Sequence, residues 1–487
     1  MNIVSYFYNF LEKSFNNFLK KYFLNSNYWF KFSDFNNYFS FMKSLDSFSS
    51  SFIKDVIIAY FEYIDNIFFN SSYRKNFCES KGFYERNNLV TIFGDISFKR
   101  RYYYDRKTNE HFFFVDLFLG LPKRKHFDPI VCSEIVEKAT EFSYSKSGRL
   151  VAEKIGNKFN NNISISRASS RNIVLGFDPI INEENETRRV ERLFIMLDEK
   201  FVPSQFNDNK DHMIKSAVMF EGSELEYKTK RKTNSMNRHR LINSHTCASI
   251  NNSLLSKTLD YIYNTYDVNY LKELYFMGDC ALWIKNFPKS HWFKFNKDTS
   301  IIFSMDGFHF SQAINNITTT KEEYIPFRDS LLDLVMNDDK ELFKEACLSF
   351  MNEHTERTQT IINKMEYVLN NWDYRKNYEN NSFLKCSMES HISHIFADLF
   401  TSRPKAYSKK GLEKLLRLRL LKVNGYNLKE IYLKSFNKKV KQQPNTIDNN
   451  IQQYNLNYHT NESIYDIEHK IDSKIYHPFE KNIIKFI

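Results

Sequence analysis

The sequence lacks the cysteine pairs that would indicate a zinc site or a disulfide framework. No two cysteines form a Cys-x-x-Cys pair, and none has a Cys or His partner at zinc-binding spacing. We therefore interpret them as buried thiols in a reducing compartment. The six are Cys78, Cys132, Cys247, Cys280, Cys347 and Cys386.

Long apolar runs are also missing. The longest, residues 112–121, contains Asp116 and is far too short to span a bilayer. The first residues show no secretory pattern, because the first basic residue is Lys13 and polar residues interrupt the apolar ones. We expect a soluble, cytoplasmic protein with no membrane partner.

Three motifs of large enzyme classes are missing as well. The chain has no Gly-x-Ser-x-Gly elbow, no phosphate-binding P-loop and no His-Glu-x-x-His zinc motif. These absences fit a reaction that needs no nucleophilic side chain from the protein.

Glycine (11) and proline (9) are scarce, whereas phenylalanine (47) and tyrosine (30) are abundant. Hydrophobic residues make up 42% of the 487 positions, which is enough for two to four domains with real cores. The net charge is 69 − 58 = +11, and this balance favours an anionic partner, nucleic acid before membrane surface. A codon bias towards lysine in an AT-rich genome is the alternative explanation.

The amino-terminal half reads as two kinds of structure. In residues 1–80, apolar residues recur at three- and four-residue steps, which predicts helices with a serine-rich break at residues 47–51. In the region 85–125, two β-rich runs around Gly94-Asp95 predict a hairpin. Its second strand carries Arg100 and Arg101 before three tyrosines, a mixture that suits a DNA-binding surface or a solvated hairpin face.

Residues 126–180 read as three short helices. The first can open at Pro129, Ser145 could cap the second, and the third is rich in serine and arginine. This order has a helix-turn-helix shape, although many three-helix units share it. The basic residues that we predict to contact DNA here are Arg149, Arg167 and Arg171.

The region 188–320 changes to alternating strands and helices. Strands are expected at 192–202, 216–220 and 246–250, then a helix at 254–266, then two strands that end in Asp279 and Asp306. A basic loop at 227–240 could grip phosphates or simply be solvated. Its predicted DNA-binding residues are Lys230, Arg231, Lys232, Arg238 and Arg240.

The rest of the chain reads as helical. Residues 321–377 are predicted to form an all-helical insertion, and residues 378–425 the second part of the same domain. Residues 426–487 are expected to be a polar, partly flexible tail.

The element order predicts an α+β multidomain protein with a ribonuclease H-like mixed-sheet catalytic domain. Helical and β-hairpin DNA-binding regions precede that domain. This plan brings three carboxylates together, which can bind two Mg²⁺ ions because Mg²⁺ prefers hard oxygen ligands; Mn²⁺ can substitute. Two such ions support in-line attack of water or a 3′-hydroxyl on a phosphodiester.

Several motifs resemble the Lre-type insertion-sequence transposases, bacterial DDE enzymes of the Mutator-like group. Residues 278–285, Gly-Asp-Cys-Ala-Leu-Trp-Ile-Lys, are similar to that family's GDGAxWIK segment. Residues 305–309, Met-Asp-Gly-Phe-His, are similar to its LDxFH segment. Residues 93–95 with 100–103, 119–121, 139–144, 388–394 and 402–408 add further matches, so the resemblance runs from about residue 85 to 425.

The resemblance implies a role for individual residues. Asp198, Asp279 and Glu389 would be the catalytic, metal-binding acids, with Asp306 and His309 as accessory residues. It also implies double-stranded DNA as partner, both element ends and target, and a homo-oligomer. Arg403 and Lys405 would contact DNA or be solvated, and Cys280 stands where the family usually has glycine.

Each of these residues also has a simpler explanation. An Asp that ends a strand is usually a turn or helix cap, a lone His is usually structural, and a helical Glu is usually solvated. Two other functions stay open beside the transposase: a ribonuclease H-fold nuclease without strand transfer, and a DNA-binding repressor whose catalytic site has decayed.

Overall fold

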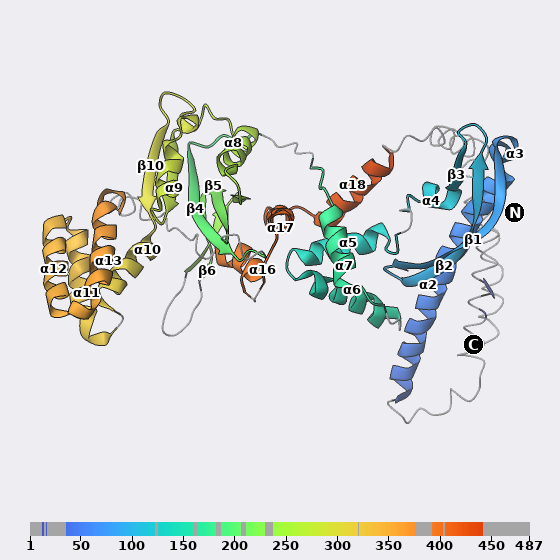
Figure 1. The fold of residues 1–487 in the computed structure, drawn as a ribbon, viewed down its shortest axis with the longest axis horizontal. Helices are drawn as coiled ribbons and strands as arrows, with labels where there is room; N and C mark the ends of the chain where they lie inside the picture. Colours follow the sequence, from blue (N-terminus) through green and yellow to red (C-terminus); the bar gives the residue numbers. More distant parts are fainter. Residues whose placement is uncertain are drawn as a thin grey trace, which may run out of the picture. The chain divides into compact units, whose positions relative to one another are not determined.

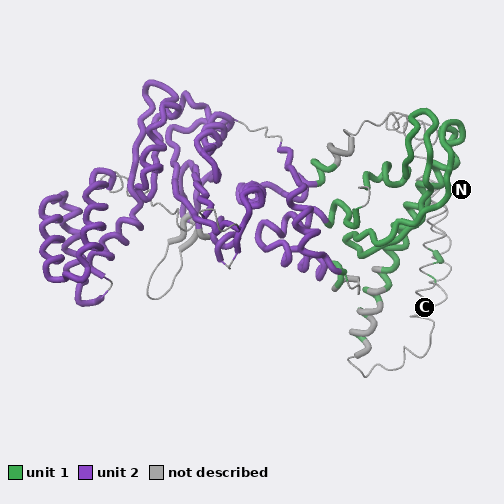
Figure 2. Tube along the Cα trace, in the orientation of Figure 1, with its two compact units in different colours: residues 1–131, 155–163, 433–487 green, residues 132–154, 164–432 purple. Residues whose placement is uncertain are grey.

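The computed structural model describes most of the chain between residues 36 and 441. The described ranges are 36–121, 125–159, 163–181, 187–205, 211–228, 237–319, 321–375, 392–402 and 405–441, with residues 12, 13 and 16. The chain divides into two compact units (Figure 2). Unit 1 comprises residues 1–131, 155–163 and 433–487, and unit 2 comprises residues 132–154 and 164–432.

Unit 1 packs a long helix against a small antiparallel sheet. The sheet has the order β1-β2-β3, with β1 Cys78–Thr91, β2 Gly94–Asp105 and β3 Glu110–Phe113. Helix α2, Asn36–Asn70, lies along it, and the short helices α3, Ser72–Phe77, and α4, Phe114–Phe118, flank it (Figure 1). The predicted hairpin is confirmed as β1 and β2, which turn at Gly94.

The core of unit 1 is aromatic. Phe68 of α2 stacks on Phe114 with ring centroids 3.9 Å apart and meets Tyr103 and Phe112 edge to face. A buried ion pair lies beside this core. The Asp65 carboxylate accepts from the Arg101 guanidinium at 2.8 Å and from the Tyr103 hydroxyl at 3.2 Å. Burial raises the pKa of Asp65, and the Arg101 charge opposes that rise.

Helix α2 corrects one expectation. The serine-rich break predicted at residues 47–51 is absent, since the helix continues without interruption from Asn36 to Asn70. Ser49 shows the physical reason, because its hydroxyl donates to the Asp46 carbonyl at 2.8 Å. A serine that bonds to its own preceding turn can remain inside a helix.

Unit 2 is built around a five-stranded mixed sheet. Its order is β10-β9-β4-β5-β8, with β4 Arg192–Val202 in the centre. Strands β5, His212–Phe220, and β8, His245–Ser249, continue antiparallel from β4 on one side. Strands β9, Glu273–Gly278, and β10, Ser300–Met305, run parallel to β4 on the other. All five strands that the sequence predicts in this region are confirmed.

The central position of β4 follows from its composition. Residues 193–197, Leu-Phe-Ile-Met-Leu, are all almost completely buried. A strand covered on both faces reads as a continuous apolar run, whereas a strand with one solvated face alternates. The predicted helix is confirmed as α8, Leu254–Thr265, and the helices α9, Leu282–Asn286, and α10, Gly307–Thr318, follow β9 and β10.

The predicted insertion is confirmed as helical but is not a separate domain. It consists of α11, Ile325–Met336, α12, Lys340–Glu353, and α13, Thr358–Asn370. Its buried residues, such as Phe343 and Ile361, belong to the same hydrophobic cluster as Leu193 and Phe276 of the sheet. Packing of α13 on α10 makes this connection. The insertion therefore shares one core with the strands that it interrupts.

The helices α5, Pro129–Ala139, α6, Tyr144–Phe159, and α7, Arg167–Gly176, confirm the predicted three-helix region. The carboxyl-terminal elements are a π-helical turn, Ser393–Ala397, then α16, Asp398–Phe400, α17, Lys409–Val423, and α18, Leu428–Lys441. The described residues also form four 3₁₀ turns: Phe287–Lys289, His291–Phe293, Glu322–Tyr324 and Thr355–Arg357.

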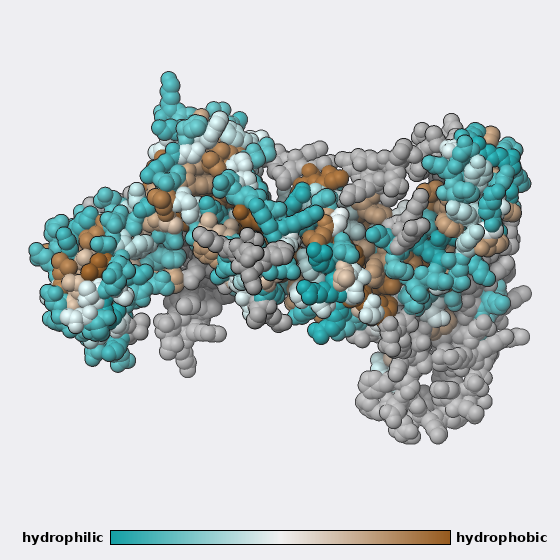
Figure 3. All heavy atoms as spheres, in the orientation of Figure 1, coloured by the Kyte–Doolittle hydropathy of each residue, from teal (hydrophilic) through white to brown (hydrophobic). Residues whose placement is uncertain are grey.

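Two further expectations differ from the structure. The segment expected as a basic loop at 227–240 is partly a two-stranded hairpin, β6 Gly222–Lys228 and β7 Asn237–Ile242. The segment expected as a tail begins with helix α18. None of the helices in the described part of the chain is long and apolar enough to cross a membrane. The visible face of the described residues is mostly hydrophilic, with scattered hydrophobic patches (Figure 3).

Gly278 is the position where the sheet tolerates no side chain. An added Cβ would lie 2.7 Å from the Ile284 Cγ2 atom and 2.9 Å from the Leu197 carbonyl oxygen. We expect Gly278→Ala to destabilise unit 2 by about 1–3 kcal/mol, because overpacking displaces backbone as well as side chains. Thermal unfolding measures this. Gly176→Ala is the matched control, since nothing lies within 4 Å of the added Cβ, and equal losses in both variants would contradict the prediction.

Candidate functional site

The parallel pairing of β4, β9 and β10 brings three predicted acids to one edge of the sheet. Met196 pairs with Met277, so the same register two residues further on sets Asp198 opposite Asp279. Met305 pairs with Gly278, and the Asp306 N–H donates to the Gly278 carbonyl at 2.8 Å. The carboxyl ends of parallel strands are where open α/β sheets bind ligands.

Asp198 lies in an environment that disfavours its charge. Burial raises the pKa of Asp198 to about 6, and the nearby Asp279 carboxylate raises it further. Two effects oppose this rise: the Glu199 N–H donates to Asp198 at 2.6 Å, and His309 lies close enough to interact electrostatically. Two neighbouring carboxylates in a desolvated site are the arrangement that a bound cation would stabilise.

Asp306 has a different role from its two neighbours. Its carboxylate caps helix α10 by accepting from the Phe308 N–H at 3.0 Å. The other carboxylate oxygen lies 2.8 Å from the His309 Nδ1 atom. This hydrogen bond raises the pKa of His309, and the charges of Asp279 and Asp198 act in the same direction. Asp306 therefore holds the imidazole and favours its protonated form beside the two acids.

The chain around Asp279 is fixed by a strained turn and by the insertion. Cys280 is buried and has a φ of +67°, a region that favours glycine. Burial raises the pKa of the Cys280 thiol to about 12, so the thiol stays protonated. The Tyr367 hydroxyl of α13 donates to the Asp279 carbonyl at 2.6 Å. The helical insertion thus supports the backbone that carries Asp279.

Glu199, the alternative to Asp198, has its own partner. Its carboxylate accepts a hydrogen bond from the Trp283 indole, and the Lys215 ammonium lies 5.1 Å from the Trp283 ring centroid. The sequence patterns assign no role to Tyr367, Trp283 or Lys215. Trp283 lies in the quoted 278–285 motif, which is the available signal, whereas nothing local in the sequence points to the other two.

The described residues supply two of the three carboxylates that were predicted to bind a hard cation. Asp198 and Asp279 offer carboxylate oxygens, the ligands that Mg²⁺ prefers. Glu389, the third predicted acid, lies outside the described residues. No group of three or more His, Cys, Asp and Glu side chains with metal-binding geometry occurs in the part of the chain that the structure describes.

The two hairpin arginines predicted to bind DNA are engaged inside unit 1. Arg100 is 9% exposed and lies 3.3 Å from the Asp116 carboxylate, and Arg101 pairs with Asp65 at 2.8 Å. A contact with DNA would have to compete with these carboxylates. The DNA-binding role of both arginines stays a prediction.

The arginines of the three-helix region lie on its surface. Arg167 and Arg171 are exposed one turn apart on α7, and Arg149 of α6 is exposed and lies 3.5 Å from Glu153. The side chain of Ser166 caps α7 by accepting from the Ser169 N–H at 3.0 Å. This geometry leaves the α7 arginines accessible to a partner.

The remaining basic candidates in the described residues lie on β7 and after α16. Arg240 on β7 is exposed and lies 2.5 Å from the Glu224 carboxylate, and Arg238 lies on the same strand. The Lys405 ammonium donates to the Leu399 carbonyl at 2.8 Å. Four others lie outside the described residues: Lys230, Arg231, Lys232 and Arg403.

Because the pKa of Asp198 is raised, the free energy of unfolding should depend on pH differently in the native protein and in an Asp198→Asn variant. The folded protein holds this proton more tightly than the unfolded chain, so the carboxyl favours folding below pH 3.8 and loses that effect as pH rises through about 6. An asparagine side chain at this position would have no proton to lose. Relative to the native protein, Asp198→Asn should therefore gain up to about 3 kcal/mol between acid and neutral pH.

Denaturant unfolding at several pH values measures this difference. Asp298→Asn makes the same chemical change at an exposed position near the opposite end of β10 and serves as control. The free energies of unfolding of Asp198→Asn and native protein are compared at each pH. If their difference stays constant across this pH range, Asp198 does not hold a proton in the folded protein as predicted.

Comparison with known proteins places these features in a family. Residues 37–437 match the model of the Uncharacterised protein family (UPF0236). The chain is 26% identical over 355 residues to a UPF0236 protein named TTE0610/TTE0881/TTE1053/TTE2432, in an alignment that covers 71% of this chain and 70% of that protein.

Two further UPF0236 proteins are similar to this chain over most of its length. UPF0236 protein TTE2489 is 26% identical, over 78% of this chain and 77% of its own length. Another, whose name joins eleven designations from TTE0033 to TTE2212, is 27% identical, over 78% of this chain and 76% of its own length. All three come from Caldanaerobacter subterraneus subsp. tengcongensis. The family match spans both units, and the chain belongs to the UPF0236 family.

Proposed function

We propose that this protein is a DDE transposase that binds the ends of its own DNA element, cleaves DNA strands and joins them to a target. The observation that carries the proposal is the register that sets Asp198 beside Asp279 at the carboxyl ends of two adjacent parallel strands. A desolvated carboxylate such as that of Asp198, with a second carboxylate beside it, is costly unless it holds a cation.

The strand order supports a ribonuclease H-like domain. From the central strand β4, the antiparallel pairings continue through β5 to β8 on one side, and the parallel strands β9 and β10 lie on the other. Helix α8 makes the connection between the two halves. This order is compatible with a ribonuclease H-like plan, in which one acid lies on the first strand and one at the end of the fourth.

The names of the relatives give independent support. One name joins four designations and another joins eleven, all from one organism. Many gene copies of the same protein in one genome are what a self-copying DNA element produces. The net charge of +11 also suits a protein that binds DNA.

Asp198 and Asp279 would hold the Mg²⁺ ions, with Glu389 as a third ligand by family resemblance. When bound, the ions would supply an activated oxygen nucleophile and charge stabilisation at the phosphodiester. Asp198 must lose its proton to act as a ligand, so a pKa of about 6 makes cation binding weaken in acid.

His309 would act on the substrate phosphate. Asp306 accepts from its Nδ1 side, and the surrounding acids favour the imidazolium. The Nε2–H could then donate to a phosphate oxygen, which fits the accessory role that the sequence predicts. The cap on α10 keeps this pair at the sheet edge.

Asp279→Asn tests the metal-ligand assignment. We expect the variant to lose at least about 100-fold in Mg²⁺-dependent strand cleavage, because one ligand charge is removed, while DNA binding is kept. Cleavage is measured on supercoiled plasmid that carries the element ends, and binding by gel shift. Asp298→Asn is the control. Full cleavage by Asp279→Asn with unchanged Mg²⁺ dependence would refute the assignment.

Strand joining separates the three candidate functions. A transposase should join a pre-cleaved 3′ end of its element to a target plasmid in the presence of Mg²⁺, and sequencing of the junctions detects the products. Cleavage without joined products would indicate a nuclease. Binding of the element ends without cleavage by the native chain would indicate a repressor.

A further inference from the structure

The main chain that enters Asp279 is fixed by the sheet. Asp279 stands directly after β9, and the Asp306 N–H at the end of β10 donates to the Gly278 carbonyl at 2.8 Å. Gly278 also packs too closely for a side chain, because an added Cβ would lie 2.9 Å from the Leu197 carbonyl oxygen. Strand pairing and close packing therefore set the position of Asp279 on its amino-terminal side.

The main chain that leaves Asp279 has an unfavourable conformation. Cys280 has a φ of +67°, in the left-handed region that a residue with a Cβ rarely adopts. Within this turn, the Ala281 N–H donates to the Asp279 Oδ1 atom at 2.9 Å. Because Ala281 follows Cys280, the position of its N–H depends on the φ of Cys280. The orientation of the Asp279 carboxylate is thus tied to a strained residue.

Tyr367 of α13 contacts the peptide group whose orientation this strain affects. Its hydroxyl donates to the Asp279 carbonyl at 2.6 Å, and this carbonyl belongs to the peptide bond between Asp279 and Cys280. Relaxation of Cys280 to a negative φ would rotate that peptide and turn its oxygen away from the hydroxyl. The hydrogen bond therefore favours the left-handed conformation of Cys280 over the relaxed one.

The position of Tyr367 is itself fixed by the insertion. Helix α13 packs on α10, and its residues Met365 and Val368 are buried in the hydrophobic cluster of the sheet. The Asn371 side chain donates to the Tyr367 carbonyl at 2.7 Å and accepts from the Lys285 ammonium at 3.2 Å. Lys285 lies on α9, which follows the turn after Asp279. Helix α13 thus contacts the turn and also the helix after it.

We infer that Tyr367 is a positioning residue for the candidate cation site. Its hydroxyl bonds to main chain, so it acts on a bound ion through Asp279 and not as a ligand. It holds the peptide after Asp279 in the conformation that keeps the carboxylate bonded to Ala281 and beside Asp198. This role rests on the proposed function, because it requires that Asp279 binds the metal ion.

Mn²⁺ binding by a Tyr367→Phe variant tests this role. The change removes only the hydroxyl, and we expect the Mn²⁺ affinity to fall about 10–100-fold, as is typical when a group that orients a ligand is lost. Electron paramagnetic resonance of Mn²⁺ measures the free and bound ion. Tyr266→Phe is the matched control and should keep native affinity, since its hydroxyl donates to the Glu221 carboxylate at 3.2 Å near the opposite end of β4.

Two substitutions of Cys280 show whether the hydroxyl acts through the turn. Glycine adopts a φ of +67° without strain, so Tyr367→Phe should weaken Mn²⁺ binding by less than about 3-fold in a Cys280→Gly background. Alanine removes the thiol but keeps the Cβ and the strain. In a Cys280→Ala background the loss should therefore stay at about 10–100-fold.

Two controls identify the site and the folded state. Thermal unfolding shows which variants are folded, and Asp279→Asn should weaken Mn²⁺ binding if the ion occupies this site. Native affinity in folded Tyr367→Phe, equal losses in the two Cys280 backgrounds, or no Mn²⁺ binding that depends on Asp279 would each overturn the positioning role. The expected losses in a native chain that binds Mn²⁺ without cleaving DNA would support the role of Tyr367 and refute the transposase.

Discussion

The parallel pairing of β4 with β9 is the constraint on which the rest of the site depends. It converts two acids that stand 81 positions apart in the sequence into neighbours, through a register that holds from Arg192↔Glu273 to Met196↔Met277. A shift of one residue would send one of the two carboxylates to the other face of the sheet. The close fit of Gly278 resists such a shift, because a residue with a Cβ in its place would lie 2.9 Å from the Leu197 carbonyl oxygen.

The desolvation of Asp198 has a cost in stability, and the surrounding structure offsets it at specific points. The Glu199 N–H and the His309 charge favour the ionised form of Asp198. Tyr367 of the insertion bonds to the backbone at Asp279, where the adjacent Cys280 has an unfavourable backbone conformation. Because the insertion shares its core with the sheet, helices α11 to α13 stabilise the strand end that carries the acid. The acid cluster is thus destabilising by itself and is supported by the domain around it.

The sequence predicts the strands of unit 2 well, but it predicts the contacts of polar residues in either unit poorly. Apolar runs such as residues 193–197 and 301–305 have a local signature that identifies buried strands. The burial of Arg100 and Arg101 has no such signature, because their partners Asp116 and Asp65 lie 16 and 36 residues away and only the fold brings them together. The hairpin of β6 and β7 escapes prediction for a related reason: polar, exposed strands have no apolar alternation to reveal them. Asp306 can likewise be identified as a strand-end acid, but its capping of α10 and its bond to His309 require the structure.

Helix α17 explains how the three-helix region can be held in place relative to the sheet. At its end, the Asn424 side chain accepts from the Thr246 N–H at 2.8 Å and donates to the Thr246 carbonyl at 3.0 Å, so an amide group pairs with the outer edge of β8 as a further strand would. Two residues earlier, Lys422 pairs with Glu141 of the turn after α5.

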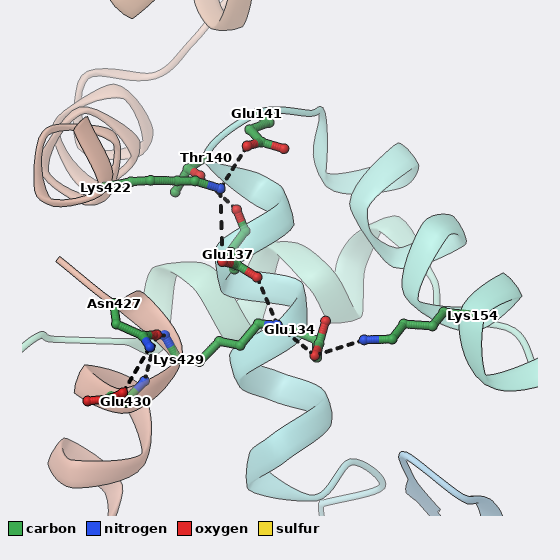
Figure 4. Close-up of polar contacts among 9 residues, drawn as sticks. All are labelled: Glu134, Glu137, Thr140, Glu141, Lys154, Lys422, Asn427, Lys429 and Glu430. Atoms are coloured by element: carbon green, nitrogen blue, oxygen red, sulfur yellow. Dashed lines mark hydrogen bonds and ion pairs between the residues drawn. The ribbon is translucent and has the colours of Figure 1, made fainter. Parts of the chain in front are cut away.

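Two acids of α5, Glu134 and Glu137, and a third in the turn after it, Glu141, pair with lysines from three helices (Figure 4). Single exposed ion pairs contribute little, but a network that shares partly buried acids holds one helix against the next. Helix α17 thus joins the edge of the sheet to the end of α5, and Arg419 on that helix donates to the Thr140 carbonyl at 3.3 Å. These contacts therefore fix the turn after α5 relative to the edge of the sheet at β8.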